Sequence, residues 1–187
     1  SGNGLHGTRI DSPANNARVT SVTGRVCRGI EIPDVRSFSN IDAIDTGLPP
    51  QKIGSTGTIT LWYKSRVSWA NQDNAIFDAS GSNKQWFILG KGKDGKLEFA
   101  VADSRNSPNI IEAEADMGNL SADTWRHLAV TWNLSGTNSR LRIYVDGTLR
   151  ATATRETTTA LNSNLRTLLI GDMRGVDSSF SSDTTGA

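Results

Sequence analysis

Apolar and polar residues alternate along several short runs of the chain, which is the pattern of β-strands with one buried face. The alternation is clearest in residues 58–64, 125–132 and 140–145. The positions that we expect to face a core are Ile59, Leu61, Tyr63, Leu128, Val130, Trp132, Leu141, Ile143 and Val145. Trp62 falls on the opposite face beside threonines, and we expect Trp62, Trp86, Trp125 and Trp132 to be structural residues within strands.

Pairs of turn-forming residues separate these runs, and no window of useful length repeats with a helical period. The pairs are Pro49-Pro50, Gly54-Ser55, Gly81-Ser82, Asp94-Gly95, Ser107-Pro108, Ser135-Gly136 and Asp146-Gly147. The two Asp-Gly pairs each join two alternating runs and predict β-hairpins. No low-complexity block divides the 187 residues, so we expect one all-β domain over residues 1–187 with a flexible tail at 176–187.

Composition narrows the classes of partner. The formal net charge of +1 gives no electrostatic reason to expect binding to nucleic acid or to an anionic membrane. No apolar run approaches the ~20 residues of a transmembrane helix, and no signal-peptide pattern opens the chain, so we expect no membrane insertion. The sequence begins at Ser1 without a methionine, and we expect it to be part of a longer protein.

Cys27 is the single cysteine of the sequence, so no disulfide can form within it. The thiol is either a small buried group or half of a bridge to another part of the parent protein. We expect a buried or unpaired thiol, because cysteine prefers protein interiors and no partner is visible. Neither His6 nor His127 has a partner at metal-ligand spacing, so we expect no zinc site.

Several stretches, taken in order, resemble the laminin-G-like and pentraxin-like modules of the concanavalin A-like superfamily. They are GTITLWYK (57–64), AIFD (75–78), DGKLEF (94–99), DTWRHLAVTW (123–132), YVDG (144–147) and LIG (169–171). The most specific part is the strand at 123–132 followed by the hairpin at 144–147. The opening SGNGLHGT is similar to the first strand of bacterial members, and the likeness spans nearly the whole chain. VCRGIEIP (26–33) and AIDTG (43–47) resemble the module of MSHA-type pilus biogenesis proteins.

This resemblance implies an antiparallel β-sandwich of jelly-roll topology. It also implies a non-catalytic recognition or adhesion module that binds carbohydrate or protein within a larger bacterial surface or exported protein. Its partners would be a glycan or surface protein and the neighbouring domains of the parent chain. Its location would be extracellular or at the cell surface, with a periplasmic or outer-membrane-associated position as the variant. The alternatives are a structural spacer in a pilus- or surface-assembly protein, and a glycoside hydrolase of the glucanase type.

The end of the chain departs from the resembled family. Family members close with a strand of the type Ile-Asp-Glu-Val-Arg-Ile-Tyr that pairs near the first strand, and nothing after Gly171 matches it. We therefore expect the closing C-terminal strand to be missing or the sheet to close differently. A missing strand would leave an unpaired edge, which favours association.

The strongest catalytic candidate is the alternating run Glu112-Ala113-Glu114-Ala115-Asp116. On a strand its carboxylates would share one face, and a retaining glycosidase needs a carboxylate pair ~5 Å apart. No aromatic residue lies between Phe99 and Trp125 to stack on a sugar, and the spacer residues are alanines. We therefore expect an acidic, solvated strand and no enzyme.

Calcium is the metal that the resemblance brings in, since pentraxin-like members use an Asp-Asn pair with later Glu and Asp ligands. The equivalent positions in this sequence are Asn83 and Lys84, with residues 172–175 as the later region. Lys84, like the arginine in residues 172–175, does not fit among the six to eight oxygen ligands of calcium, so we expect no site of that type. Calcium elsewhere stays open, and the loop with Asp42 and Asp45 is the place for it.

Sugar binding is the remaining candidate chemistry, and it needs an aromatic platform flanked by polar side chains. Trp69 lies in the polar loop 65–74 and is the best candidate for an exposed ring. We predict a ligand-binding site at Trp69, Asn71, Asp73 and Asn74. The alternative for Trp69 is a loop anchor that packs over the edge of the sandwich.

Overall fold

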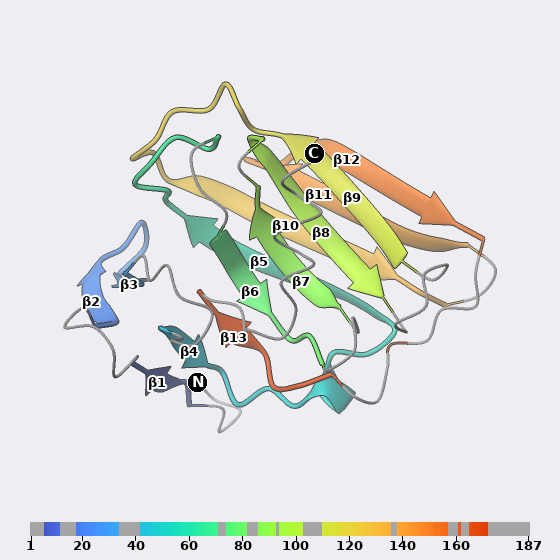
Figure 1. Cartoon of the computed structure of the whole chain (residues 1–187), viewed down its shortest axis with the longest axis horizontal. Coiled ribbons are helices and arrows are strands. Elements are labelled where there is room, and N and C mark those ends of the chain that lie inside the picture. The colour runs from blue at the N-terminus through green and yellow to red at the C-terminus, as the bar shows by residue number, and fades with distance from the viewer. Residues whose placement is uncertain are drawn as a thin grey trace.

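The computed structural model describes residues 6–11, 18–33, 42–70, 74–81, 86–92, 94–102, 110–135, 138–156, 161 and 165–171. Within these ranges the chain is all-β apart from one short 3-10 turn, η1 (Pro50–Lys52). The strands form two layers that lie face to face, with β6–β9 in front and β5 and β10–β12 behind in Figure 1. The expected antiparallel β-sandwich is confirmed.

The front layer is a seven-stranded sheet with the order β1-β4-β13-β6-β7-β8-β9. Its strands are β1 (Thr8–Ile10), β4 (Ala43–Asp45), β13 (Leu169–Ile170), β6 (Asn74–Asp78), β7 (Phe87–Lys91), β8 (Lys96–Ala102) and β9 (Ile110–Asp116). The back layer is a four-stranded sheet with the order β12-β11-β10-β5. Its strands are β12 (Thr148–Arg155), β11 (Ser139–Val145), β10 (Arg126–Asn133) and β5 (Thr56–Tyr63). A separate hairpin pairs β2 (Thr20–Thr23) with β3 (Arg28–Glu31).

The alternation of the sequence sets the two faces of the four-stranded sheet as predicted. In β10 and β11 the expected core residues are buried, and their neighbours in the sequence point outward. In β5, Ile59, Leu61 and Tyr63 are partly buried against the core, while Trp62 lies on the outward face. This match follows from the period of two along a strand, which a one-residue shift would invert.

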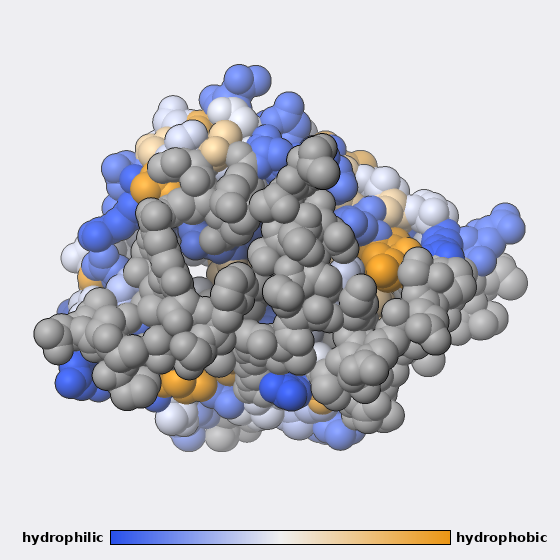
Figure 2. All heavy atoms as spheres, viewed as in Figure 1, coloured by the Kyte–Doolittle hydropathy of each residue, from blue (hydrophilic) through white to orange (hydrophobic). Residues whose placement is uncertain are grey.

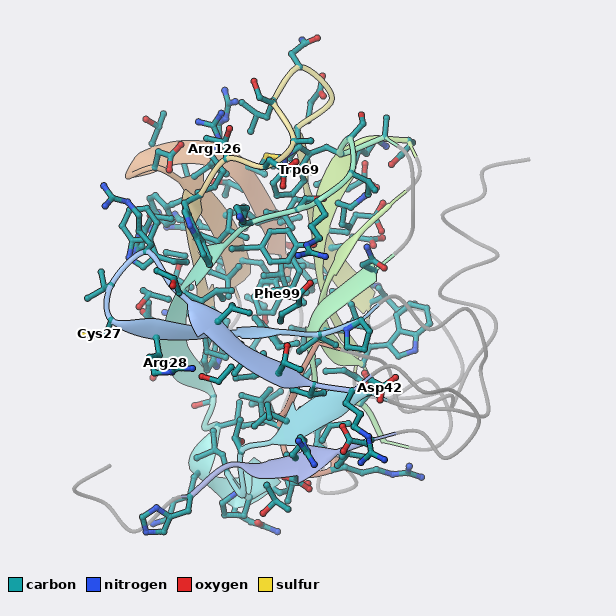
Figure 3. All side chains as sticks on the ribbon, turned by 90° about the vertical axis from the view of Figure 1, so that its left-hand side faces the viewer. Cys27, Arg28, Asp42, Trp69, Phe99 and Arg126 are labelled. Carbon is teal, nitrogen blue, oxygen red and sulfur yellow. The ribbon has the colours of Figure 1, made fainter. Side chains whose placement is uncertain are left out.

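Aromatic rings hold the two layers together. Trp132 of the four-stranded sheet meets Phe87 of the seven-stranded sheet at a ring-centroid distance of 5.0 Å and an interplanar angle of 82°. Phe87 in turn lies edge-on to Phe99 at 5.5 Å. Edge-to-face pairs of this kind stabilise a core by about 0.5–1.5 kcal/mol each beyond the burial of their area. Figure 3, seen from the side, shows Phe99 between the two layers.

Both Asp-Gly hairpins form. Asp146 and Gly147 connect β11 to β12 with φ values of 50° and 80°, and positive φ at both positions is what a type I′ turn requires. Gly95, in the connection between β7 and β8, has a φ of 82°. These turns place β8 and β11 next to their partners with a short connection.

Cys27 was expected to be buried or unpaired; within the described residues its thiol is unpaired, and it is not buried. Its thiol is free and exposed, at the tip of the hairpin between β2 and β3 (Figure 3). Cys27 has a φ of 57° and its carbonyl accepts a hydrogen bond from the Gly24 N–H at 3.0 Å. The residues beside it in the turn, from Arg25 to Arg28, are exposed as well.

The C-terminal end of the described chain lies inside the seven-stranded sheet. β13 pairs with β4 on one side and with β6 on the other. The strand is therefore central, although it is only two residues long. The expected absence of a closing strand and the expected flexible tail concern residues beyond Gly171, which lie outside the described residues.

Gly57 provides a test of the packing between the layers. It lies opposite Trp132 in the register, and a Cβ atom there would lie 2.2 Å from Trp132 Cζ2. Gly57→Val should therefore lower the free energy of unfolding by about 1–3 kcal/mol, because the indole ring already fills the space. Urea unfolding followed by tryptophan fluorescence measures this change.

The matched control is Thr58→Val, which adds the same side chain at the adjacent, outward-facing position. We expect this variant to change the free energy of unfolding by about 0.5 kcal/mol or less. Equal stability of Gly57→Val and Thr58→Val would contradict the packing of Trp132 over Gly57.

Candidate functional site

Trp69, the ring expected to be exposed, is a core residue with an exposed fraction of 0%. Its ring lies edge-on to Tyr63 at a centroid distance of 5.6 Å. The Nζ of buried Lys91 donates to the Trp69 carbonyl at 3.0 Å and to the Ser68 carbonyl at 3.3 Å. The predicted exposed platform at Trp69 is therefore wrong, and the ring anchors its loop to the core, as the alternative supposed.

Of the other predicted binding residues, the structure describes Asn74. Asn74 opens β6, where it is half-buried and pairs with Lys91 in the register. Asn71 and Asp73 lie outside the described residues. Ligand binding by Asn71, Asp73 and Asn74 stays a prediction.

The alternating acidic run does form a strand, as the sequence predicts. In β9, Glu112, Glu114 and Asp116 point outward and are exposed, while Ala113 and Ala115 are buried against the core. The outward face of β9 continues the outward face of the seven-stranded sheet. In the view of Figure 2, from the side of this sheet, the described residues at the rim of the face are mostly hydrophilic.

Glu98 of β8 joins this acidic face. It lies directly opposite Glu114 in the register, yet it is only 3% exposed, and its Oε2 has no hydrogen-bond partner. A Cβ atom at position 92 would lie 2.7 Å from Asp94 Oδ1 and 3.2 Å from Glu98 Oε1, so a glycine there leaves room for both carboxyl groups. The sequence signal was the alternation of charged and apolar residues in 96–99, which places Glu98 outward.

Lys96 is the cation of the acidic face. Its Nζ donates to Glu114 Oε2 at 2.6 Å and lies 3.4 Å from Asp94 Oδ2. The hydrogen bond to Glu114 raises the pKa of Lys96. Glu114 is thus tied to an ammonium group, whereas Glu98 is not.

Burial raises the pKa of Glu98 to about 8, and the nearby charges of Glu112, Asp94 and Glu114 act in the same direction. The charge of Lys96 opposes the shift without reversing it. Glu98 therefore carries a proton at neutral pH and is a hydrogen-bond donor beside carboxylates. A protonated acid beside an ionised carboxylate is also the pair that general acid catalysis requires.

The opposite face of the sandwich carries an exposed aromatic ring. We call this area the Trp62 surface: Trp62, His127, Tyr144 and Leu149 on the outward side of the four-stranded sheet, with Arg25 above them. Trp62 is 41% exposed, and its ring meets His127, its partner in the register, at a centroid distance of 5.2 Å. The Arg25 guanidinium lies 5.3 Å from the centre of the Trp62 ring.

Tyr144 and Leu149 extend the Trp62 surface across β11 and β12. They are register partners of each other, and Ala129 of β10 pairs with Tyr144 on its other side. Leu149 is 49% exposed. Trp62 lies within β5, as expected, and on the outward face that its place beside threonines predicts.

The described residues contain no group of three or more His, Cys, Asp or Glu side chains arranged to hold a metal ion. In the loop considered for calcium, Asp45 accepts hydrogen bonds from the Gly47 N–H at 2.9 Å and from Thr167 Oγ1 at 3.0 Å. These bonds tie the loop to the residues before β13. The positions equivalent to the pentraxin-type ligands are Asn83, Lys84 and residues 172–175, and they lie outside the described ranges. The expectation that no calcium site of that type is present therefore stays a prediction.

Nothing in the described part of the chain forms a helix long and apolar enough to cross a bilayer.

Comparison with known proteins identifies a family for this chain. A family model described as the concanavalin A-like lectin/glucanases superfamily matches residues 38–185. A search of curated proteins gave no match.

Solved structures share the fold. The CBM40 domain of the Ruminococcus gnavus IT-sialidase, solved with α2,3 sialyllactose bound, superposes with a TM-score of 0.51 at 15% identity over 66% of this chain and 68% of that chain. The full-length tailspike protein 2 of an Escherichia coli O157:H7 bacteriophage superposes with a TM-score of 0.52 at 14% identity. That match covers 92% of this chain and 24% of the tailspike. Identities this low show a common fold alone.

The buried acid predicts a specific pH dependence. Between its ordinary pKa of 4.5 and about 8, Glu98 holds a proton in the folded protein that the unfolded chain has released. The free energy of unfolding should therefore fall as pH rises through this window, by at most about 1.4 kcal/mol per pH unit. Glu98→Gln should remove this slope, as measured by urea unfolding from pH 5 to pH 9.

Glu156→Gln is the control, because it removes an exposed carboxylate that lies just after β12. It should keep the pH slope of the unaltered protein. A slope that persists in Glu98→Gln would show that Glu98 is not the buried acid responsible.

Proposed function

The chain belongs to the laminin-G-like family of the concanavalin A-like lectin/glucanases superfamily, and from this premise we propose that it is a non-catalytic carbohydrate-binding module. The Trp62 surface is the proposed binding site. We place the module outside the cell or at the cell surface, as part of an adhesion or recognition protein. A surface protein that carries the glycan is the partner at that location.

The exposed ring of Trp62 is the observation that carries the proposal. An outward-facing strand position is readily filled by threonine, as in the rest of β5, so a tryptophan there leaves apolar area in water without contributing to the core. Tryptophan offers a rigid, amphipathic face to a ligand at a low cost in conformational entropy. A sugar ring, with apolar C–H groups on its faces and hydroxyls at its edge, fits such a platform.

The groups around the ring supply the polar contacts that a sugar needs. His127 lies against the edge of Trp62, and the guanidinium of Arg25 lies above the ring. Arg25 belongs to the exposed turn of the β2–β3 hairpin, so it can move with a ligand while the sheet stays fixed. The CBM40 domain that shares the fold was solved with a bound glycan, which supports a glycan as the kind of partner.

A second function, glycoside hydrolysis, is favoured by one observation, the raised pKa of Glu98 beside Glu112 and Glu114. Side chains directly opposite each other on neighbouring strands have Cβ atoms about 4.5–5.5 Å apart, which suits a retaining pair with Glu98 as acid and Glu114 as nucleophile. Two observations weigh against it. Glu98 is 3% exposed, and Lys96 holds Glu114 in a hydrogen bond.

The structural spacer of a pilus- or surface-assembly protein is the remaining alternative, and it requires neither surface to bind. The MSHA-type resemblance of residues 26–33 and 43–47 is its support. In the described structure, residues 28–31 form β3 of the two-stranded sheet, and residues 43–45 form β4 of the seven-stranded sheet. Neither strand belongs to the four-stranded sheet that carries the Trp62 surface.

Trp62→Ala should lower the affinity for the best ligand on a glycan array by at least about ten-fold, because central aromatic contacts dominate binding energies. Trp62→Phe should keep part of the affinity, since it retains a ring. Val26→Ala is the control, because it removes an exposed apolar side chain at the hairpin tip. The melting temperatures of all three variants should stay close to that of the unaltered protein.

The outcomes separate the functions. Binding that survives in Trp62→Ala but is lost in Glu114→Gln would move the site to the seven-stranded sheet and contradict the proposal. An array without any bound glycan would contradict carbohydrate binding and favour the spacer.

Hydrolysis has its own assay. We expect no release of reducing ends when the protein is incubated with mixed-linkage β-glucan at pH 6, because Glu98 is shielded and Glu114 is paired. Release that disappears in both Glu98→Gln and Glu114→Gln, and persists in Trp62→Ala, would establish the hydrolase instead.

A further inference from the structure

The outward residues of β9 and those of the four-stranded sheet differ in charge. The acidic face of the seven-stranded sheet contains Glu112, Glu114 and Asp116 of β9. Within the strands of the four-stranded sheet the outward-facing ionisable residues are cationic or neutral, and the exposed acids Asp146 and Glu156 directly follow β11 and β12. The formal net charge of +1 conceals this separation.

Two arginines lie in line on the outward side of β11. Arg140 and Arg142 are two residues apart on one strand, so their Cα atoms are about 7 Å apart and their side chains leave the same face. The register surrounds Arg142 with Thr131 and Thr152, which are neutral. Within the described residues neither guanidinium forms an ion pair, so both charges are available to a ligand.

Two more cations lie at the other end of the sheet. Arg25 covers Trp62, and Lys64 lies with its Nζ 5.6 Å from the centre of the Trp125 ring. Neither cation is paired with a carboxylate in the described structure. Asp146, an acid on this side, is already engaged, since its carboxylate accepts from Arg126 Nη1 at 3.0 Å and from the His127 N–H at 2.9 Å.

We infer that the Trp62 surface selects acidic saccharides: a sugar ring packs at Trp62, and carboxylate or sulfate groups along the glycan meet Arg25 at one end and Arg142 and Arg140 at the other. The inference rests on the proposed carbohydrate-binding function and names its ligand class. Guanidinium groups pair with planar carboxylates and with sulfates through two parallel hydrogen bonds, which adds specificity to the charge attraction.

A glycan is a better occupant of this surface than a nucleic acid. Binding to a duplex or single strand uses many basic residues along the backbone, whereas here Arg142 is flanked on the neighbouring strands by Thr131 and Thr152. Threonine hydroxyls donate and accept hydrogen bonds, as sugar hydroxyls do. The row formed by Thr58, Thr131, Arg142 and Thr152 crosses the whole four-stranded sheet.

The experiment compares acidic saccharides with matched neutral ones. The probes are 3′-sialyllactose against lactose, tetragalacturonate against its full methyl ester, and dextran sulfate against dextran, each titrated at 20 mM and at 500 mM NaCl. We expect at least one acidic member to bind about ten-fold or more tightly than its neutral partner at low salt. The preference should shrink at high salt, because exposed charges are screened.

Variants assign the preference to the arginines. Arg142→Gln and Arg140→Gln should each lower the affinity for the acidic saccharide of a pair by about three- to ten-fold. The affinity for the neutral saccharide should not change. Arg166→Gln, an exposed arginine in the segment before β13, is the control and should change neither. The melting temperature of each variant checks that the fold is retained.

The possible results separate the two hypotheses. If the neutral saccharides bind as tightly as the acidic ones or more tightly, and this binding is lost in Trp62→Ala, the acidic selectivity is overturned and the carbohydrate-binding function is kept. Binding of none of the six probes, together with an array without any bound glycan, would overturn both. Tighter binding of a dT oligonucleotide than of any acidic saccharide would overturn the inference in favour of nucleic acid.

Discussion

The packing of the two sheets through one shared layer of side chains is the constraint on which the rest of the structure depends. Trp132 of the four-stranded sheet meets Phe87 and Phe99 of the seven-stranded sheet at centroid distances of 5.0 and 6.3 Å. Successive residues of a strand point to opposite faces. Once this inward layer is fixed, every strand that contributes to it must turn its alternate residues outward, and both candidate surfaces are made of those residues.

The outward faces put these residues to different uses. On β8 the inward ring of Phe99 is preceded in the alternation by outward Glu98, which is buried without a partner for Oε2. Burying an ionised carboxylate costs several kcal/mol, and protonation avoids most of that cost. On β5 the inward Leu61 is followed by outward Trp62, which remains in water. At neutral pH Glu98 therefore holds a proton on the seven-stranded sheet, whereas Trp62 presents an apolar ring beside Arg25 on the four-stranded sheet.

Two errors of interpretation have the same physical origin. Trp69 was expected in solvent because its neighbours in the sequence are polar, but the loop folds its ring inward and Lys91 binds its carbonyl. Cys27 was expected to be buried or unpaired because thiols prefer the interior, but it lies exposed in the turn between β2 and β3. Average preferences of residue types do not report the path of a loop, since that path depends on contacts distant in the sequence.

The sequence by itself determined the all-β class, the inward and outward positions of the long strands, both Asp-Gly hairpins and the family resemblance. These features depend on local periodicity, on turn chemistry and on short motifs. Only the tertiary structure decided which outward residues become neighbours: Glu98 beside Glu114, Trp62 beside His127 and beneath Arg25. The physical reason is that a period of two assigns a residue to a face, whereas its neighbours on that face depend on strand order and register, which are set by packing between distant segments.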